Sequence, residues 1–114
     1  MTTIYKVLDS AAWQTAQNSG FFSGSAVDVR DGFIHFSAKD QLAETLHKHF
    51  AGGSDLVLLY IRSERIADGL RWEPSRGGAL FPHLYAPLPV AAVHRVEALR
   101  LDAHGSHILP SLED

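Results

Sequence analysis

The stretch Asp55–Arg62, DLVLLYIR, decides how the rest of the sequence is interpreted. All its residues except the first and the last are apolar. A strand with one face in water alternates apolar and polar side chains, whereas a strand covered on both faces reads as a continuous apolar run. The stretch therefore predicts a central strand with packed material on both sides. The run is far too short to cross a bilayer.

Weaker strand and helix patterns surround this central strand. Further strands are expected at residues 3–8, 32–37, 70–73, 79–85 and 91–99. One helix is expected at residues 9–20, because Asp9 or Ser10 can cap its start and Gly20 can end it. A second helix is expected to begin at a capping box formed by Ser37 to Asp40 and to run to about Phe50. Residues 21–32, rich in glycine and aspartate, are interpreted as a loop.

This order of elements predicts the fold class. Two helices in the N-terminal half and five or six strands indicate an α+β domain, because the elements do not alternate regularly enough for a doubly wound fold. The chain of 114 residues is the size of one domain, so residues 1–114 are expected to form a single unit. Its core is expected at about residues 3–100, followed by a polar C-terminal tail at residues 101–114.

The composition excludes several classes of protein. Apolar residues make up 46% of the chain and charged residues 20%, the balance of a soluble globular domain. The chain has no cysteine, which excludes disulfides and thiolate chemistry and favours a cytoplasmic location. A net charge of −3 gives no strong signal for DNA binding, which usually needs a basic stripe, although net charge leaves a local basic pocket open. The first ten residues do not resemble a signal peptide, and no membrane association is expected.

Seven histidines suggest a metal site, but their spacing argues against one. His47 and His49 lie two residues apart on an expected helix, so they point about 200° away from each other. His49 falls on the apolar stripe with Leu42 and Leu46 and is interpreted as a half-buried core residue. His47 falls on the solvent side. We therefore expect no metal.

His35 allows two interpretations. It lies in the middle of the strand GFIHFS, on one face with Phe33 and Ser37, while Ile34 and Phe36 occupy the other. It could be a core histidine that donates to a backbone carbonyl. It could also point into a ligand cleft with the Ser37 hydroxyl beside it.

The stretch RWEPSRGGALFPHLY, residues 71–85, also allows two interpretations. Its glycines and prolines are typical of turns, and Trp72 could belong to the core or line a cleft. Alternatively, the charged side chains and the aromatic rings could form one wall of a site for an anionic, ring-bearing ligand. The residues that suggest such a wall are Arg71, Trp72, Glu73, Arg76, His83 and Tyr85.

The chain resembles a known family, the small uncharacterised bacterial proteins called DUF952. The resemblance rests on IYKV, DGFIHFS, HFAG, LVLL, RWEPSRGG and LFPHLY and extends over residues 3 to about 100. It implies an ADP-ribosyltransferase-like fold, in which two small, packed, mostly antiparallel sheets grip NAD in a cleft. FIHFS is also similar to a histidine-containing strand of the RNA 2′-phosphotransferases, which implies a functional role for His35.

The resemblance also indicates roles for other residues. Tyr5 and Lys6 stand where the wider superfamily has a histidine or arginine that faces NAD. Glu73 is a candidate for the late-strand glutamate that stabilises the ribosyl cation, although the Q/E-x-E pattern is absent. His35, Glu73, Arg76 and His83 are the candidate catalytic residues. The candidate substrate-binding residues are Tyr5, Lys6, Ser37, Arg71, Trp72, Gly77 and Tyr85.

Three functions remain open from the sequence. The chain could be a transferase acting on NAD or on an ADP-ribosylated or 2′-phosphorylated substrate. It could be a non-catalytic module that binds a nucleotide or a phosphorylated metabolite. It could also be a protein-interaction domain in which these motifs preserve the fold. NAD is expected only as a substrate, and no resident cofactor is indicated.

Overall fold

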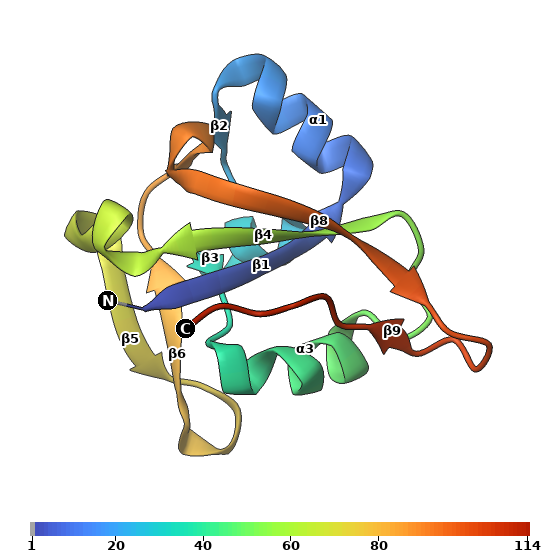
Figure 1. Ribbon diagram of the computed structural model, residues 1–114. Helices are drawn as coiled ribbons and strands as arrows, with labels where there is room; N and C mark the ends of the chain where they lie inside the picture. The colour runs from blue at the N-terminus through green and yellow to red at the C-terminus, as the bar shows by residue number, and fades with distance from the viewer. Residues whose placement is uncertain (1) are drawn as a thin grey trace.

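The central strand of the fold is β4 (Leu56–Arg62), which lies between β1 (Thr3–Asp9) and β8 (Val93–Leu101). Figure 1 shows this arrangement in the computed structural model, which describes residues 2–114 apart from the side chain of Arg76. The order of the first sheet is β1-β4-β8-β9, with β9 (His107–Ile108) as its short edge strand. All pairs in this sheet are antiparallel.

Two smaller antiparallel sheets accompany the first. One has the order β3-β6-β5, and the other pairs β2 with β7. Their strands are β2 (Phe21–Phe22), β3 (Ile34–His35), β5 (Leu70–Pro74), β6 (Leu80–Leu84) and β7 (Leu88–Pro89). The expected α+β class with antiparallel sheets is confirmed, although the described residues form three sheets rather than two.

Three α-helices and four short 3₁₀ segments accompany these strands in the described part of the chain. The helices are α1 (Ser10–Ser19), α2 (Ala26–Asp31) and α3 (Leu42–His49). The 3₁₀ segments are η1 (Lys39–Gln41), η2 (Ser63–Gly69), η3 (Arg76–Gly78) and η4 (Val90–Ala92). No helix among residues 2–114 combines the length and the apolar character that a membrane crossing requires.

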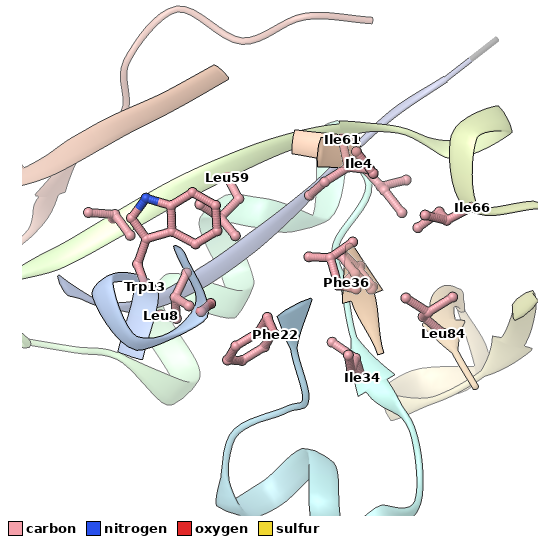
Figure 2. Packing of buried hydrophobic residues seen from close by; sticks show 14 residues of the cluster. Ile4, Leu8, Trp13, Phe22, Ile34, Phe36, Leu59, Ile61, Ile66 and Leu84 are labelled. Atoms are coloured by element: carbon pink, nitrogen blue, oxygen red, sulfur yellow. The ribbon is translucent and has the colours of Figure 1, made fainter. Parts of the chain in front are cut away.

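The β4 strand separates two apolar cores, as its sequence predicts. Val57, Leu59 and Ile61 point into the larger core, which also contains residues of α1, β2, β3 and β6. Figure 2 shows this packing. Leu58 and Tyr60 point to the opposite side, where the smaller core packs against α3. Because the side chains of a strand alternate, one continuous apolar run supplies both cores.

The helix α2 was not expected, and the interpretation of residues 21–32 as a loop is wrong. Ser25 and Asp28 form a capping box: the Ser25 Oγ accepts from the Asp28 amide, and the Asp28 carboxylate accepts from the Ser25 amide. Gly32 ends the helix with a φ of 86°, a left-handed conformation that glycine adopts at little cost. Asp28 and Gly32, which suggested a loop, are therefore signals at the two ends of a short helix.

The start of α3 also differs from the expectation. The Ala38 amide donates to Gln41 Oε1, while the Ser37 hydroxyl hydrogen-bonds the Thr45 hydroxyl. Ser37 to Asp40 therefore do not form the expected capping box. The interpretation of His49 as a core residue is also wrong, because His49 is exposed, as is His47.

The polar tail packs against the smaller core. After β9 it runs back along the sheet and ends near the start of β1 (Figure 1). The buried hydroxyls of Tyr5 and Tyr60 donate to the carbonyls of Glu113 and Ser111, and Leu112 packs against the same core. The tail therefore covers this face of the sheet, and its carbonyls supply the hydrogen-bond acceptors that the two buried phenol hydroxyls need.

Candidate functional site

The short sheet β3-β6-β5 brings the candidate residues together. His35 lies opposite His83 in the register, and their ring centroids are 5.5 Å apart. The Phe33 ring stacks on His83 at 4.1 Å and also lies 5.2 Å from Tyr85. Glu73 reaches the same place from β5. We call Phe33, His35, Glu73, His83 and Tyr85 the histidine cluster.

A buried ion pair anchors one side of this cluster. The Lys6 ammonium lies 2.9 Å from Asp28 Oδ2 and also donates to the His35 carbonyl at 2.9 Å. The Lys6 and Asp28 side chains are only 8% and 2% exposed. Burial lowers the pKa of Lys6, against the opposing effect of the Asp28 charge. Burial alone would raise the pKa of Asp28, but the Lys6 charge and the hydrogen bonds from Ser25 and His35 outweigh it and lower the pKa.

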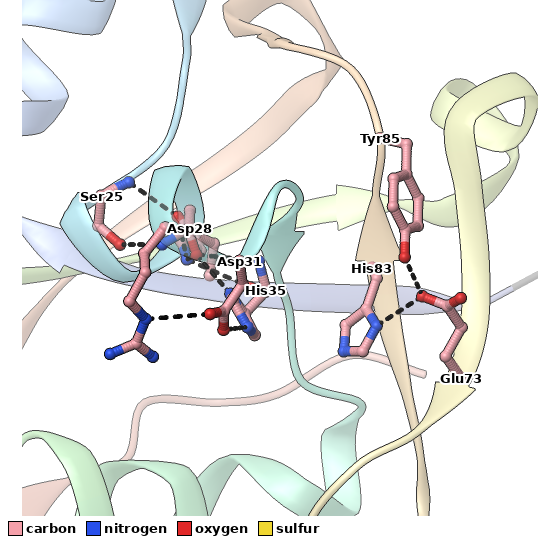
Figure 3. Close-up of polar contacts among 9 residues, drawn as sticks. Ser25, Asp28, Asp31, His35, Glu73, His83 and Tyr85 are labelled. Atoms are coloured by element: carbon pink, nitrogen blue, oxygen red, sulfur yellow. Dashed lines mark hydrogen bonds and ion pairs between the residues drawn. The ribbon is translucent and has the colours of Figure 1, made fainter.

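His35 lies between two carboxylates (Figure 3). Its Nδ1 is 2.7 Å from Asp28 Oδ1, and its Nε2 is 2.9 Å from Asp31 Oδ2. The backbone amide of His35 also donates to Asp28 Oδ1. The side chain is partly exposed, so His35 is not the carbonyl-bound core histidine of the first interpretation. Both of its ring nitrogens are nevertheless engaged within the protein.

Glu73 is held by two donors on the other side of the cluster. His83 Nδ1 lies 2.8 Å from Glu73 Oε1, and the Tyr85 hydroxyl donates to the same oxygen at 2.7 Å. Figure 3 shows these two bonds converging from β6 and from the residue after it. The hydrogen bonds from Tyr85 and then His83 lower the pKa of Glu73. The carboxylate is therefore held in its charged form, and no described residue donates to Oε2.

One ring nitrogen of His83 has no partner among the described side chains and backbone groups. The residue is 4% exposed, and its Nε2 is buried without a hydrogen-bonding group among the described residues. An unsatisfied buried polar atom costs about 1–3 kcal/mol. Such an atom in a native protein calls for an explanation, and a ligand or a bound water is one.

The other predicted residues lie apart from this cluster or beside it. Tyr5 is buried in the smaller core, and the Ser37 hydroxyl hydrogen-bonds the Thr45 hydroxyl. Arg71 is exposed and lies over the Tyr85 ring, with its Cζ 5.8 Å from the ring centroid. Trp72 is 41% exposed, so of its two interpretations the one as a core residue is wrong, and the one as a residue that lines a site stays a prediction.

The turn between β5 and β6 contains the two remaining candidates, Arg76 and Gly77. Gly77 has a φ of 68°, and Gly78 has a φ of 83°. A Cβ at either position would meet nothing within 4 Å. Backbone conformation rather than space therefore requires glycine there. The predicted role of Arg76 depends on a side chain that lies outside the described part of the structure.

The sequence interpretation missed Asp28 and Asp31, because both lie in the segment taken as a loop. The three-residue spacing from Ser25 to Asp28 was the available signal, since it matches a capping box. A capping residue does not by itself indicate a functional group, however. Nothing in the local pattern shows that Lys6, 22 residues earlier, forms an ion pair with the Asp28 carboxylate.

The cluster lies on a partly exposed surface, apart from two hollows in the described part of the chain. One hollow lies between α3 and the tail and is lined by residues such as Leu46, His47 and His107. The other lies beside η2 and is lined by residues such as Ile66 and Pro89. No cluster residue lines either hollow. Within residues 2–114, no group of three or more acidic or histidine side chains is arranged to hold a metal ion.

Fold and site together define a small α+β protein with a carboxylate-bound pair of histidines on its short sheet. Residues 7–96 match the family described as "Protein of unknown function (DUF952)", and the chain belongs to this family. It is similar to protein CC0527 from Caulobacter crescentus. The X-ray structure of that protein is 52% identical, covers 94% of each chain and gives a TM-score of 0.91. Its solution NMR structure is 54% identical, covers 93% of this chain and 91% of that one, and gives a TM-score of 0.84. No curated protein matches the chain.

The buried ion pair makes a testable contribution to acid stability. Because the pKa of Asp28 is lower in the folded chain than the ordinary value of 3.8, ionised Asp28 favours the folded state. This contribution is fully present above the unfolded pKa, about 4, and is lost as the pH falls through the folded pKa. Urea unfolding between pH 7 and pH 2.5 should show a loss that is smaller in Asp28→Asn. An equal loss in both proteins would contradict the assignment.

Proposed function

We propose that the chain is an enzyme of the ADP-ribosyltransferase-like type that acts on NAD or on an ADP-ribosylated or 2′-phosphorylated substrate. The observation that carries this proposal is the Glu73 carboxylate, which Tyr85 and His83 hold through one oxygen. Cleavage of a ribosyl–nitrogen bond builds positive charge on the sugar. A fixed carboxylate with its second oxygen available can stabilise that charge, because it does not need to reorganise during the reaction.

Neighbouring residues supply the remaining parts of such a site. The rings of Phe33 and Tyr85 are partly or largely exposed and offer flat surfaces for a base or a nicotinamide ring. Arg71 lies beside Tyr85 as a cation for a phosphate group. Arg76 is proposed to bind a phosphate group of the substrate. The Asp28 and Asp31 contacts give His35 a positioning role in this scheme, since its ring nitrogens are already engaged.

The family resemblance supports the same class of enzyme through the fold. An ADP-ribosyltransferase-like arrangement has small, packed, mostly antiparallel sheets, and this chain has antiparallel sheets with few helices. Fold alone does not imply function, so the proposal depends on the site residues. Lys6 departs from the superfamily pattern, because Asp28 and the His35 carbonyl engage its ammonium group.

Replacing Glu73 with glutamine should lower the rate of nicotinamide release from NAD about 10²-fold. The amide keeps the shape of the side chain but removes the charge that would oppose the ribosyl cation. Nicotinamide can be measured by chromatography, with Glu64→Gln on η2 as a control for a neutral change at an exposed glutamate. Equal rates for Glu73→Gln and the wild type would exclude the proposed role of Glu73.

A binding module is the second candidate, and a specific observation favours it. Both ring nitrogens of His35 are engaged, and no cluster residue lines either of the two hollows, as expected for a surface that recognises a ligand without enclosing it. Amide-shift NMR titration with NAD, ADP-ribose and a 2′-phosphorylated nucleotide distinguishes the candidates. Saturable shifts at residues 33–37 and 71–85 that weaken in Arg76→Ala, without product after long incubation, would favour the module. An absence of shifts at millimolar ligand would contradict both candidates.

A further inference from the structure

The buried Nε2 of His83 distinguishes this residue from the histidine opposite it. His35 and His83 are paired across β3 and β6, and each binds a carboxylate through Nδ1. Asp31 also engages Nε2 of His35, whereas no described residue engages Nε2 of His83. His107, another partly buried histidine, directs its Nε2 to the Gly53 carbonyl. Within this pair, only His83 has an Nε2 without a partner among the described residues, and its side chain is also the more buried of the two.

The Glu73 contact determines what this nitrogen can do. A charged carboxylate only accepts hydrogen bonds, so the contact at 2.8 Å places the imidazole proton on Nδ1. When the ring is neutral, this tautomer carries a lone pair on Nε2. A carboxylate on one imidazole nitrogen, with a lone pair on the other, is the arrangement that enzymes use to take a proton from a hydroxyl group.

We propose that His83 Nε2 is the general base of this site and that the acceptor substrate is a hydroxyl group, either water or an alcohol. This inference rests on the proposed function and adds the class of the second substrate. In the step, the bond from the ribose carbon to the nicotinamide nitrogen breaks, and its electron pair leaves with nicotinamide. The hydroxyl oxygen forms the new bond to that carbon, and its proton passes to Nε2.

The two oxygens of Glu73 then have separate tasks. Oε1 binds the imidazole and stabilises the imidazolium that forms when Nε2 takes the proton. Oε2, which no described residue engages, is available for the positive charge on the ribose. The Phe33 ring, stacked on the imidazole at 4.1 Å, fixes the plane of the ring and excludes bulk water from its face.

Nitrogen NMR tests the tautomer without requiring any turnover. Long-range proton–nitrogen spectra of ¹⁵N-labelled protein distinguish a protonated from a bare imidazole nitrogen. We expect a bare Nε2 on His83 at neutral pH, and Glu73→Gln should shift the His83 resonances. A proton that resides on Nε2 would overturn the inference, whatever the activity of the protein.

Replacing His83 with asparagine tests the base itself. The asparagine amide can occupy the place of Nδ1 and donate to Glu73, but it has no group at the place of Nε2. We expect kcat for nicotinamide release to fall about 10²-fold with KM nearly unchanged, and the limb of the pH–rate profile that reports the base to disappear. In the wild type, added methanol should divert part of the product to methyl ADP-ribose. A thermal melt checks that the variant is folded.

The outcomes separate the two proposals. If the wild type releases nicotinamide and His83→Asn retains both kcat and the pH limb, the general base is excluded while the proposed function stands. If methanol gives no methyl ADP-ribose, free methanol is excluded as the acceptor and water is left as the acceptor in this assay. If the wild type releases no nicotinamide, the proposed activity on NAD fails and the role of His83 in that reaction fails with it, even where Nε2 is bare.

Discussion

Replacing Asp28 with asparagine should lower the free energy of unfolding by about 3–5 kcal/mol, because it leaves the buried Lys6 ammonium without its counter-charge. The Asp28 carboxylate also accepts from the Ser25 amide, the His35 amide and His35 Nδ1. One side chain therefore joins β1, α2 and β3. Urea unfolding monitored by circular dichroism measures the loss directly.

Two further variants make this result specific. Asp31→Asn removes the other carboxylate that touches His35, but Asp31 is much more exposed, so we expect a loss under about 1 kcal/mol. The double variant Lys6→Met, Asp28→Asn removes both buried charges and should recover part of the stability that Asp28→Asn loses. A double variant less stable than Asp28→Asn would show that the unpaired charge of Lys6 is not the source of the loss.

The larger features of the fold follow from local sequence patterns. The apolar run in β4 predicts a strand covered on both faces, and the two cores on either side of Leu58 and Leu59 confirm it. The pattern was sufficient because side-chain alternation is a property of the strand itself. The expected strands at residues 70–73 and 79–85 are likewise present as β5 and β6.

The candidate site was predictable only in part. His35, Glu73 and His83 could be selected from their neighbours in sequence, and the structure places them in one cluster. Their partners could not be predicted, because the Lys6 and Asp28 contacts join segments far apart in the chain. Which residues at distant positions meet depends on sheet register and helix placement, and local patterns do not contain that information.

The tail shows the same limit for a polar segment. Residues 101–114 lack a strong apolar pattern, so composition predicts only an exposed end. The hydroxyls of Tyr5 and Tyr60 nevertheless need acceptors when buried, and the carbonyls of the tail provide them. The structure of the core shows that these two hydroxyls need acceptors, whereas the sequence of the tail does not.

Replacing Leu59 with alanine should lower the free energy of unfolding by about 2–5 kcal/mol, and Leu58→Ala should cost a similar amount. Both side chains are completely buried, but they enter different cores because they point to opposite faces of β4. Each substitution removes buried apolar surface and leaves a cavity that the packed neighbours fill only in part. Urea unfolding of the two variants therefore compares the two cores within a single strand.

Val96→Ala is the matched control for this comparison. Val96 lies opposite Leu59 in the β4–β8 register but is 39% exposed, so its truncation should cost under about 1 kcal/mol. If Leu58→Ala were as mild as Val96→Ala, the face under α3 and the tail would not be a packed core. A large loss at both leucines would instead show that the core under α3 and the tail contributes as much to stability as the core on the other face. This result is expected because the sequence of β4 predicts burial on both of its faces.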